Sequence, residues 1–381
     1  MRLQSIKYSE HVGGLQEWVL EGLALESKNL IVGKNATGKT RSLNVIGALA
    51  RFLAGLQGPP LSSTYDCLFT HKGQKYQYAL VAEEQQVKVE RLLVDGELKL
   101  ERGEGGVGHI WAQEIDGGTQ VKFQTPTTEF AAVARRDSIQ HAFLEPLFEW
   151  ATSLRHYYFG TSLGKDTLAI RLLRERVVVD ERDPNALVGL FRQARDEFGE
   201  KFTSSLVDDL AAVDYTVKSV DIGSPVSVRF SGTPGEVVSL LVQEADLPGL
   251  TDQHSMSQGM FRVLALLVHL NYFELKRAGA CVLIDDIGEG LDFDRSCRLV
   301  NLLRRKADKS DIQLVMSTND RFIMNEVPLE EWSVLQRKNN HVAVRNYENS
   351  RALFDEFKFT GLSNFSFLEL DVIHEPQQTR E

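Results

Sequence analysis

The sequence predicts an α/β fold, a parallel sheet flanked by helices and interrupted by a β-rich segment and a helical segment. Three observations predict it. A glycine-rich stretch, Gly33–Thr40, joins an apolar strand to an amphipathic helix. Helix and strand signals alternate from Gly259 to Met316, as they do in parallel sheets. Short strands separated by turn residues fill about 65–128, which is typical of antiparallel pairing.

The first 60 residues predict two strands and one helix. The strands are Leu3–Tyr8 and Asn29–Val32, with a turn around Gly13-Gly14 between them. The helix runs from about Lys39 to Leu53, and Gly55 ends it. Its apolar face is formed by Leu43, Ile46, Ala50 and Leu53.

The β-rich segment, 61–135, contains five apparent strands with Asp-Gly turns between some of them. Their sequences are KYQYALVAE, QVKVERLLVD, ELKLE, HIWAQEI and TQVKFQ. Helical signals then dominate from Ile139 to about Val213, followed by the short strands TVKSVDI and VSVRF. A loop rich in Gly, Pro and Asp is expected from there to Gln253.

The last alternating part predicts two helices and two strands. The helices are Gly259–Arg277 and Asp294–Lys306, and the strands are Cys281–Ile284 and Ile312–Met316. Cys281–Ile284 is apolar without interruption, which indicates a parallel strand covered on both faces.

Composition excludes some classes of protein. The net charge of −10 and the pI near 5.5 do not support a protein that coats nucleic acid. Two basic clusters leave a local nucleic-acid-binding patch as an alternative, although solvated helix faces explain these clusters equally well. The clusters are Arg171/Arg174/Arg176 and Arg304/Arg305/Lys306.

No export or metal-thiolate signal is present in the sequence. The N-terminus, MRLQSIKYSE, has no apolar signal region, and no apolar run reaches the ~18 residues that would span a bilayer. The three cysteines lack metal-ligand spacing. We therefore expect a soluble cytoplasmic protein with no membrane partner.

The stretch Gly33–Thr40, GKNATGKT, matches the phosphate-binding pattern G-x-x-x-x-G-K-[ST] in its required strand-to-helix context. The glycines let successive N–H groups point into one concavity at the positive end of a helix dipole, where they bind a β-phosphate. Lys39 adds a charge to the β/γ oxygens, and Thr40 supplies a hydroxyl ligand for Mg²⁺. The expected nucleotide contacts are Gly33, Asn35, Ala36, Thr37, Gly38, Lys39, Thr40 and Arg41.

A second motif, Cys281–Asp286, is an apolar strand that ends in two carboxylates, the Walker B arrangement. Asp285 is the expected Mg²⁺ ligand, and Asp286 is placed to orient or deprotonate the attacking water. Alone, this pattern is commonly a strand ending in an Asp-rich turn, but beside a phosphate loop it favours an ATP site. Thr40 and Asp285 are about 245 residues apart, and the guanine-reading N-K-x-D motif is absent, which disfavours GTPases and compact P-loop modules.

A third motif, Ser255–Arg262, resembles the ABC signature, written L-S-G-G-Q in transporters and L-S-x-G in the SMC/Rad50/OLD branch. Ser257, Gln258 and Gly259 align with it, and Met256 replaces the leucine. The resemblance implies that these residues bind the γ-phosphate of the opposite subunit. The motif lies about 28 residues before Asp285, the spacing that the branch leads us to expect.

Two further segments extend the resemblance. Gly290-Leu291-Asp292 resembles the D-loop, and Met316–Asp320 resembles the switch segment, with Asn319 at its key position. In order and spacing the chain resembles the small bacterial ATPases called AAA_15 or AAA_21, relatives of OLD and Rad50 heads, over about 1–55 and 250–345.

The resemblance implies one RecA/ABC-like P-loop head over 1–381. Its expected parts are a P-loop core (1–60 and 278–345), an antiparallel β insertion (61–135), a helical lobe carrying the signature (136–277) and an aromatic-rich tail (346–381). It also implies a homodimer that closes around ATP and Mg²⁺. Such a dimer would gate a separate effector, a nuclease or toxin, or a DNA-related process such as phage defence or DNA maintenance.

Two departures favour slow chemistry. Asp286 stands where the family usually has Glu, and Asn319 stands where it usually has His; both are expected catalytic residues together with Lys39. The Q-loop glutamine is not identified. The alternative function is therefore an ATP-binding scaffold or sensor with negligible turnover.

The tail contains the aromatic runs Phe354–Phe359 and Asn364–Leu368. They either dock a partner or pack back on the head. We favour packing as an edge strand.

Overall fold

The computed structural model covers residues 1–381 and describes all of them except 114–116, 172–178, 184, 230–234, 278 and 371–381. The chain forms two compact units. Unit 1 consists of Met1–Leu154 and Val327–Glu381, and unit 2 of Arg155–Glu326. The strand that ends at Asp285 and the segment around Ser257 both fall in unit 2, whereas the tail from residue 346 falls in unit 1.

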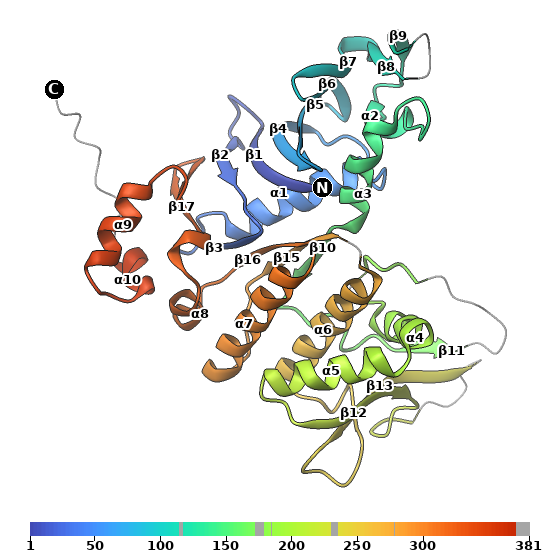
Figure 1. The fold of residues 1–381 in the computed structure, drawn as a ribbon, viewed down its shortest axis with the longest axis vertical. Helices are drawn as coiled ribbons and strands as arrows, with labels where there is room; N and C mark the ends of the chain where they lie inside the picture. Colours follow the sequence, from blue (N-terminus) through green and yellow to red (C-terminus); the bar gives the residue numbers. More distant parts are fainter. Residues whose placement is uncertain (114–116, 172–178, 184, 230–234, 278, 371–381) are drawn as a thin grey trace. The chain divides into compact units, whose positions relative to one another are not determined.

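Unit 1 is built on one large sheet (Figure 1). Its strands run in the order β3-β17-β18-β2-β1-β4-β5-β6-β7-β8-β9. They are β1 (Arg2–Glu10), β2 (Trp18–Ala24), β3 (Lys28–Val32), β4 (Ser62–His71), β5 (Gln74–Glu83), β6 (Gln86–Val94), β7 (Glu97–Arg102), β8 (Val107–Ala112), β9 (Thr119–Gln124), β17 (Trp332–Lys338) and β18 (His341–Asn346). The pairs β3/β17 and β18/β2 are parallel, and the pairs from β2 to β9 are antiparallel.

The predicted strands of the β-rich segment are present, although residues 114–116 of HIWAQEI lie outside the described part. They continue the N-terminal sheet, because β4 pairs with β1. Strand β2 was not predicted. Its Trp18, Leu20 and Leu23 are buried, and β2 joins β1 to β18 in the sheet.

The helices of unit 1 are α1 (Lys39–Leu53), α2 (Ala131–Ala134), α3 (Glu145–Ser153), α9 (Arg351–Phe359) and α10 (Asn364–Glu369), with 3₁₀ turns η1 (Glu104–Gly106), η2 (Ala142–Leu144) and η3 (Leu329–Glu331). Helix α1 has the predicted bounds, and its Leu43, Ile46, Ala50 and Leu53 are buried as one apolar stripe.

The tail corrects a prediction. It packs on unit 1, but as two helices and not as an edge strand. Phe354, Phe357 and Phe367 are buried against one another, whereas Phe359 is 92% exposed. The three-residue spacing of Phe354 and Phe357 puts both on one helical face, which decides the element.

Unit 2 contains three parallel strands in the order β10-β15-β16, namely β10 (Arg155–Tyr158), β15 (Ala280–Asp285) and β16 (Ile312–Ser317). A smaller sheet holds β11 (Ala169–Arg171), β12 (Val217–Gly223), β13 (Glu236–Glu244) and β14 (Thr251–Asp252). The helices are α4 (Leu187–Phe198), α5 (Glu200–Ala212), α6 (Gln258–Lys276), α7 (Phe293–Lys309) and α8 (Arg321–Glu326).

Four strands of unit 2 correct predictions: β11 lies, like β10, where helix was expected, and β14 lies, like β13, where a loop was expected. Strand β10 lies where helix was expected, and its parallel partner β15 determines its conformation. Strand β13 lies where a loop was expected, although EVVSLLVQE is rich in apolar and β-branched residues. The expected strand VSVRF is not a strand at 226–229, and Phe230 lies outside the described residues.

Candidate functional site

The phosphate loop turns tightly at the start of α1. A Cβ on Gly33 would lie 2.6 Å from Thr37 Oγ1 and 2.8 Å from the Leu335 carbonyl oxygen, so only glycine fits. Gly38 has a φ of +104°, which glycine adopts without steric cost. The Thr37 hydroxyl donates to the Lys34 carbonyl oxygen at 2.8 Å and closes the loop on itself. These contacts hold the loop in a compact turn.

Lys39 is 7% exposed and donates to the carbonyl oxygens of Gly33 (2.9 Å) and Lys34 (3.4 Å). Its ammonium group therefore lies at the phosphate loop, hydrogen-bonded to the first two residues of the motif. Thr40 is exposed in the first turn of α1, where backbone N–H groups have no acceptor within the helix. Together these groups offer donors and a positive charge to an anion.

The predicted contact residue Arg41 has protein partners of its own. Its guanidinium lies over the Trp18 ring, 4.5 Å from the centroid, and pairs with Glu10. A Cβ on Gly38 would lie 3.2 Å from the same ring, so Trp18 supports both the loop and Arg41.

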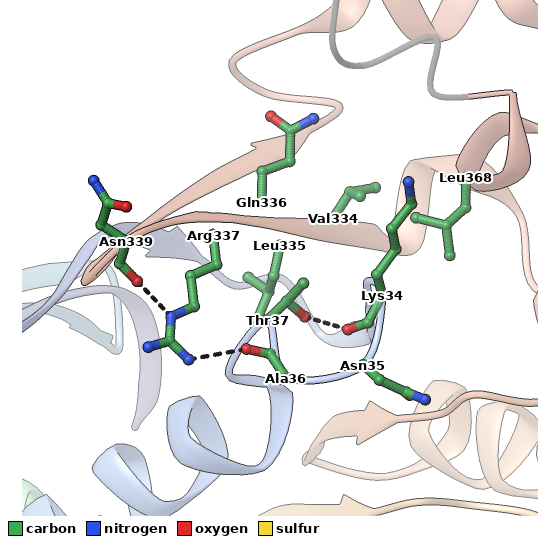
Figure 2. A pocket seen from close by; sticks show the side chains of 10 residues that line it. All are labelled: Lys34, Asn35, Ala36, Thr37, Val334, Leu335, Gln336, Arg337, Asn339 and Leu368. Carbon is green, nitrogen blue, oxygen red and sulfur yellow. Dashed lines mark hydrogen bonds between the residues drawn. The ribbon is translucent and has the colours of Figure 1, made fainter.

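A cavity of about 480 Å³ adjoins the phosphate loop within unit 1 (Figure 2). It is lined by Lys34, Asn35, Ala36, Thr37, Val334, Leu335, Gln336, Arg337, Asn339 and Leu368. Arg337 donates to the carbonyl oxygen of Ala36 at 3.1 Å, which connects β17 to the loop (Figure 2). The loop is thus supported from a strand about 300 residues further along the chain.

In unit 2, Asp285 ends the fully buried strand β15 and is 4% exposed. Ser317, at the end of β16, donates from Oγ to Asp285 Oδ1 at 2.5 Å. Asp286 follows in the left-handed region, with a φ of +54°, and its N–H donates to Ser317 Oγ at 3.0 Å. Asn319 Nδ2 donates to Asp286 Oδ1 at 3.4 Å. The two predicted catalytic residues of this unit therefore touch each other.

The carboxylate of Asp285 fits a hard cation. A buried carboxylate with a single neutral donor is costly unless a positive charge approaches it. Carboxylate and hydroxyl oxygens are the ligands that Mg²⁺ takes in nucleotide sites. Asp285 in unit 2 and the exposed residue Thr40 in unit 1 each carry an oxygen ligand of this kind.

The signature residues start helix α6. Ser257 is the N-cap and accepts from the N–H of Met260 at 3.2 Å, as capping serines do. Ser257 is exposed, and Gln258 donates to the Thr161 carbonyl oxygen at 3.3 Å. A Cβ on Gly259 would lie 2.9 Å from the Gly290 carbonyl oxygen, so the signature packs on the D-loop segment of its own chain.

Arg262 was not singled out by its sequence context. Its guanidinium donates to the carbonyl oxygens of Gly160, Thr161 and Glu289 at 2.7–2.8 Å, and burial lowers its pKa. These hydrogen bonds hold helix α6 against the chain at Glu289, immediately before the D-loop segment. No sequence signal reveals this role, because all three acceptors are backbone atoms.

Asp252, just before the signature, was also missed. Burial opposes its ionisation, but hydrogen bonds from the backbone and hydroxyl of Ser227 and from Ser255 outweigh it and bring its pKa to about 2. The charged carboxylate therefore fixes the loop that leads to Ser257.

The predicted site residues thus form two groups. Unit 1 brings Gly33, Asn35, Ala36, Thr37, Gly38, Lys39, Thr40 and Arg41 together in one turn. Unit 2 brings Asp285, Asp286 and Asn319 together and holds Ser257, Gln258 and Gly259 at the start of α6.

Charge and hydropathy add two findings. Lys306 is neutralised by Asp209 and Glu274 at 2.8 Å, which removes one charge from its basic cluster. Arg174 and Arg176 of the other cluster lie outside the described residues. Among the described helices, none has the length and apolar character needed to cross a membrane.

Comparison with known proteins relies on structure, because no protein-family model matches the chain and a search of curated proteins finds no relative. The SMC head bound to the C-winged helix domain of ScpA matches 93% of this chain and 99% of its own length, at 11% identity and a TM-score of 0.54. The SMC head domain from Thermotoga maritima matches 91% and 99%, at 14% identity and a TM-score of 0.41. The Smc head with an extended coiled coil, bound to a ScpA domain derived from Pyrococcus furiosus, matches 93% and 99%, at 11% identity and a TM-score of 0.45. The first of these likenesses shows that the chain has the mixed α/β fold of an SMC head domain.

Proposed function

We propose that this chain is a slow cytoplasmic ATPase that binds ATP and Mg²⁺ through Gly33–Thr40 and closes as a homodimer. The observation that carries the proposal is the loop itself. Gly33 admits no side chain, and the buried ammonium of Lys39 spans the loop at the N-terminus of a helix. This arrangement suits a nucleotide polyphosphate.

Each site residue has a proposed role. Backbone N–H groups of the loop hold the β-phosphate, and Lys39 moves from its carbonyl acceptors to the β/γ oxygens. Thr40 and Asp285 hold Mg²⁺, which neutralises charge on the phosphates when bound. Asp286 orients the attacking water, and Asn319 holds Asp286 through the contact at 3.4 Å.

The proposed dimer uses the signature in trans. Ser257 is exposed at the N-terminus of α6, where its hydroxyl and nearby N–H groups suit the γ-phosphate held by a second copy. In this arrangement 61–135 is the β insertion and 136–277 the lobe that carries the signature. The resemblance to OLD-type ATPases supports these assignments by analogy.

The output of the switch is proposed to reach a separate protein. The SMC head of similar fold is bound to a domain of another protein, ScpA. By analogy, a nuclease or toxin subunit, in phage defence or DNA maintenance, is the proposed effector. The alternative is a scaffold that holds ATP without turnover, which the short side chain of Asp286 favours.

Nucleotide binding is tested with Lys39→Ala. Loss of the buried ammonium costs about 2–4 kcal/mol of binding, so the dissociation constant for MgATP in calorimetry rises at least tenfold. Lys75→Ala, at an exposed lysine on β5, is the matched control and binds as the wild type does. Unchanged affinity in Lys39→Ala excludes the loop as the nucleotide site.

The in-trans signature is tested by mixing two inactive chains. A Lys39→Ala chain and a Ser257→Arg chain form a heterodimer with one intact composite site, so ATPase activity partly returns on mixing. If the subunits exchange, as shown by differently tagged copies, and no activity returns, the signature does not act across a dimer.

A further inference from the structure

Ser317 touches both residues of the aspartate pair through one hydroxyl group. Its Oγ donates to Asp285 Oδ1 at 2.5 Å and accepts from the Asp286 N–H at 3.0 Å. The side chain is fully buried, so water does not compete for these bonds. Strands β15 and β16 are parallel with Ile284 opposite Met316, which is why Ser317 stands beside Asp285.

The first bond orients the carboxylate of Asp285. Within the described residues it is the one hydrogen bond that the structure gives this side chain. It commits Oδ1 to a protein donor and leaves Oδ2 as the oxygen that can face a cation. A donor behind a ligating carboxylate fixes the ligand and tunes its affinity for metal.

The second bond holds the backbone of Asp286. Its φ of +54° is unfavourable for a residue with a side chain, so the turn needs support. Ser317 supplies it twice, because its carbonyl oxygen also accepts from the Ile287 N–H at 2.9 Å. Ser317 therefore fixes three consecutive residues of the turn, and Asn319 then reaches the carboxylate of Asp286.

We propose that Ser317 is a positioning residue that sets the Mg²⁺ ligand Asp285 and the water-orienting carboxylate Asp286 at the same time. The inference rests on the proposed ATPase function. It requires that loss of the hydroxyl weakens the metal-dependent part of ATP binding and slows hydrolysis. It also requires that ATP binding without metal, which uses the loop of unit 1, stays intact.

The experiment compares Ser317→Ala with Ser317→Thr and with Ser239→Ala, whose hydroxyl is equally buried but lies in β13. Calorimetry measures the dissociation constant for ATP once with Mg²⁺ and once with EDTA. The EDTA value divided by the Mg²⁺ value is the increase in ATP affinity that the metal provides, here called the gain from metal. Single-turnover assays give the hydrolysis rate, and thermal unfolding gives the stability of each variant relative to the wild type.

In Ser317→Ala the gain from metal is expected to fall by a factor of about ten or more, which is the usual effect of removing a hydrogen-bond partner of a metal ligand. The affinity of this variant for ATP in EDTA matches that of the wild type. Its hydrolysis rate falls together with the gain from metal. Ser317→Thr restores the gain because it restores the hydroxyl. Ser239→Ala keeps the gain and the rate.

Two results overturn the inference. In one, Ser317→Ala keeps the full gain from metal. In the other, it loses affinity equally with Mg²⁺ and EDTA and unfolds well below Ser239→Ala, which shows a merely structural role. Either result leaves the proposed function standing as long as Lys39→Ala weakens ATP binding at least tenfold, so the two failures are distinguishable.

Discussion

The left-handed backbone of Asp286 leads to a prediction about three substitutions at this position. At a φ of +54°, a residue with a Cβ costs about 1–2 kcal/mol relative to glycine, and Asp and Asn tolerate it best. Asp286→Asn therefore keeps the fold and removes the charge. Asp286→Gly removes the carboxylate and relieves the backbone. Asp286→Glu restores the reach usual in the resembling family but strains the turn.

The expected rates follow from the role of the carboxylate. Orienting or deprotonating a water contributes about 10²–10⁴ in rate, so Asp286→Asn and Asp286→Gly lower single-turnover hydrolysis at least a hundredfold, about 2.7 kcal/mol of barrier. In urea unfolding, the Gly variant is at least as stable as the wild type, and the Glu variant is about 1 kcal/mol less stable. Asp286→Glu also hydrolyses more slowly, because its carboxylate leaves the 3.4 Å contact with Asn319.

The assay pairs hydrolysis of radiolabelled ATP with size-exclusion chromatography. Asp286→Asn is expected to accumulate an ATP-dependent dimer, since the step that reopens it is blocked. A wild-type protein without turnover, indistinguishable from Asp286→Asn, would establish the scaffold function in place of the switch. An Asp286→Glu protein faster than the wild type would refute the backbone reasoning while leaving the carboxylate role intact.

Three further substitutions test other parts of the structure. Gly33→Ala places a Cβ 2.8 Å from the Leu335 carbonyl oxygen and is expected to lower the free energy of unfolding by about 1–3 kcal/mol, measured by thermal unfolding. Gly103→Ala, where a Cβ meets open space, is the control and is expected to cost much less. Equal losses in the two variants would contradict the close approach at Gly33. Phe367→Ala is expected to cost about 3–5 kcal/mol, and a neutral effect would mean that α10 does not pack. Asp252→Asn lowers stability by about 2 kcal/mol at pH 7, because the folded pKa of about 2 lies below the unfolded value near 3.9. This difference is lost as the pH falls from about 5 toward 2, and a pH-independent difference in urea unfolding would contradict it.

The parts of the fold that sequence reasoning predicted are those encoded locally. The phosphate loop, α1, β15, α6 and α7 each carry their signal within one short window, so their positions are confirmed to within a few residues. Strand β10 was missed because RHYY becomes a strand only through its parallel partner β15. The tail was predicted as an edge strand, whereas Phe354 and Phe357 are three residues apart and are buried on one face of a helix.

The parts of the site that sequence reasoning missed depend on contacts across long stretches of chain. Ser317 and Asp285 are separated by 32 residues, and Arg337 and Ala36 by 301. A serine at the end of an apolar strand, or an arginine near a hairpin, has no pattern that names its partner. Such residues become visible only when the strand order is known.

The strand order of unit 1 has a consequence for synthesis of the protein. Strands β17 and β18 lie between β3 and β2, yet β17 begins about 300 residues after β3 ends. At 5–20 residues per second, a ribosome needs roughly 15–60 s to supply them. During that interval the nascent chain carries two strands with vacant neighbouring positions, and its phosphate loop lacks the hydrogen bond from Arg337 to Ala36. Nucleotide binding is therefore expected to be acquired late in translation, and the unpaired edges of β2 and β3 are where a chaperone would be needed most.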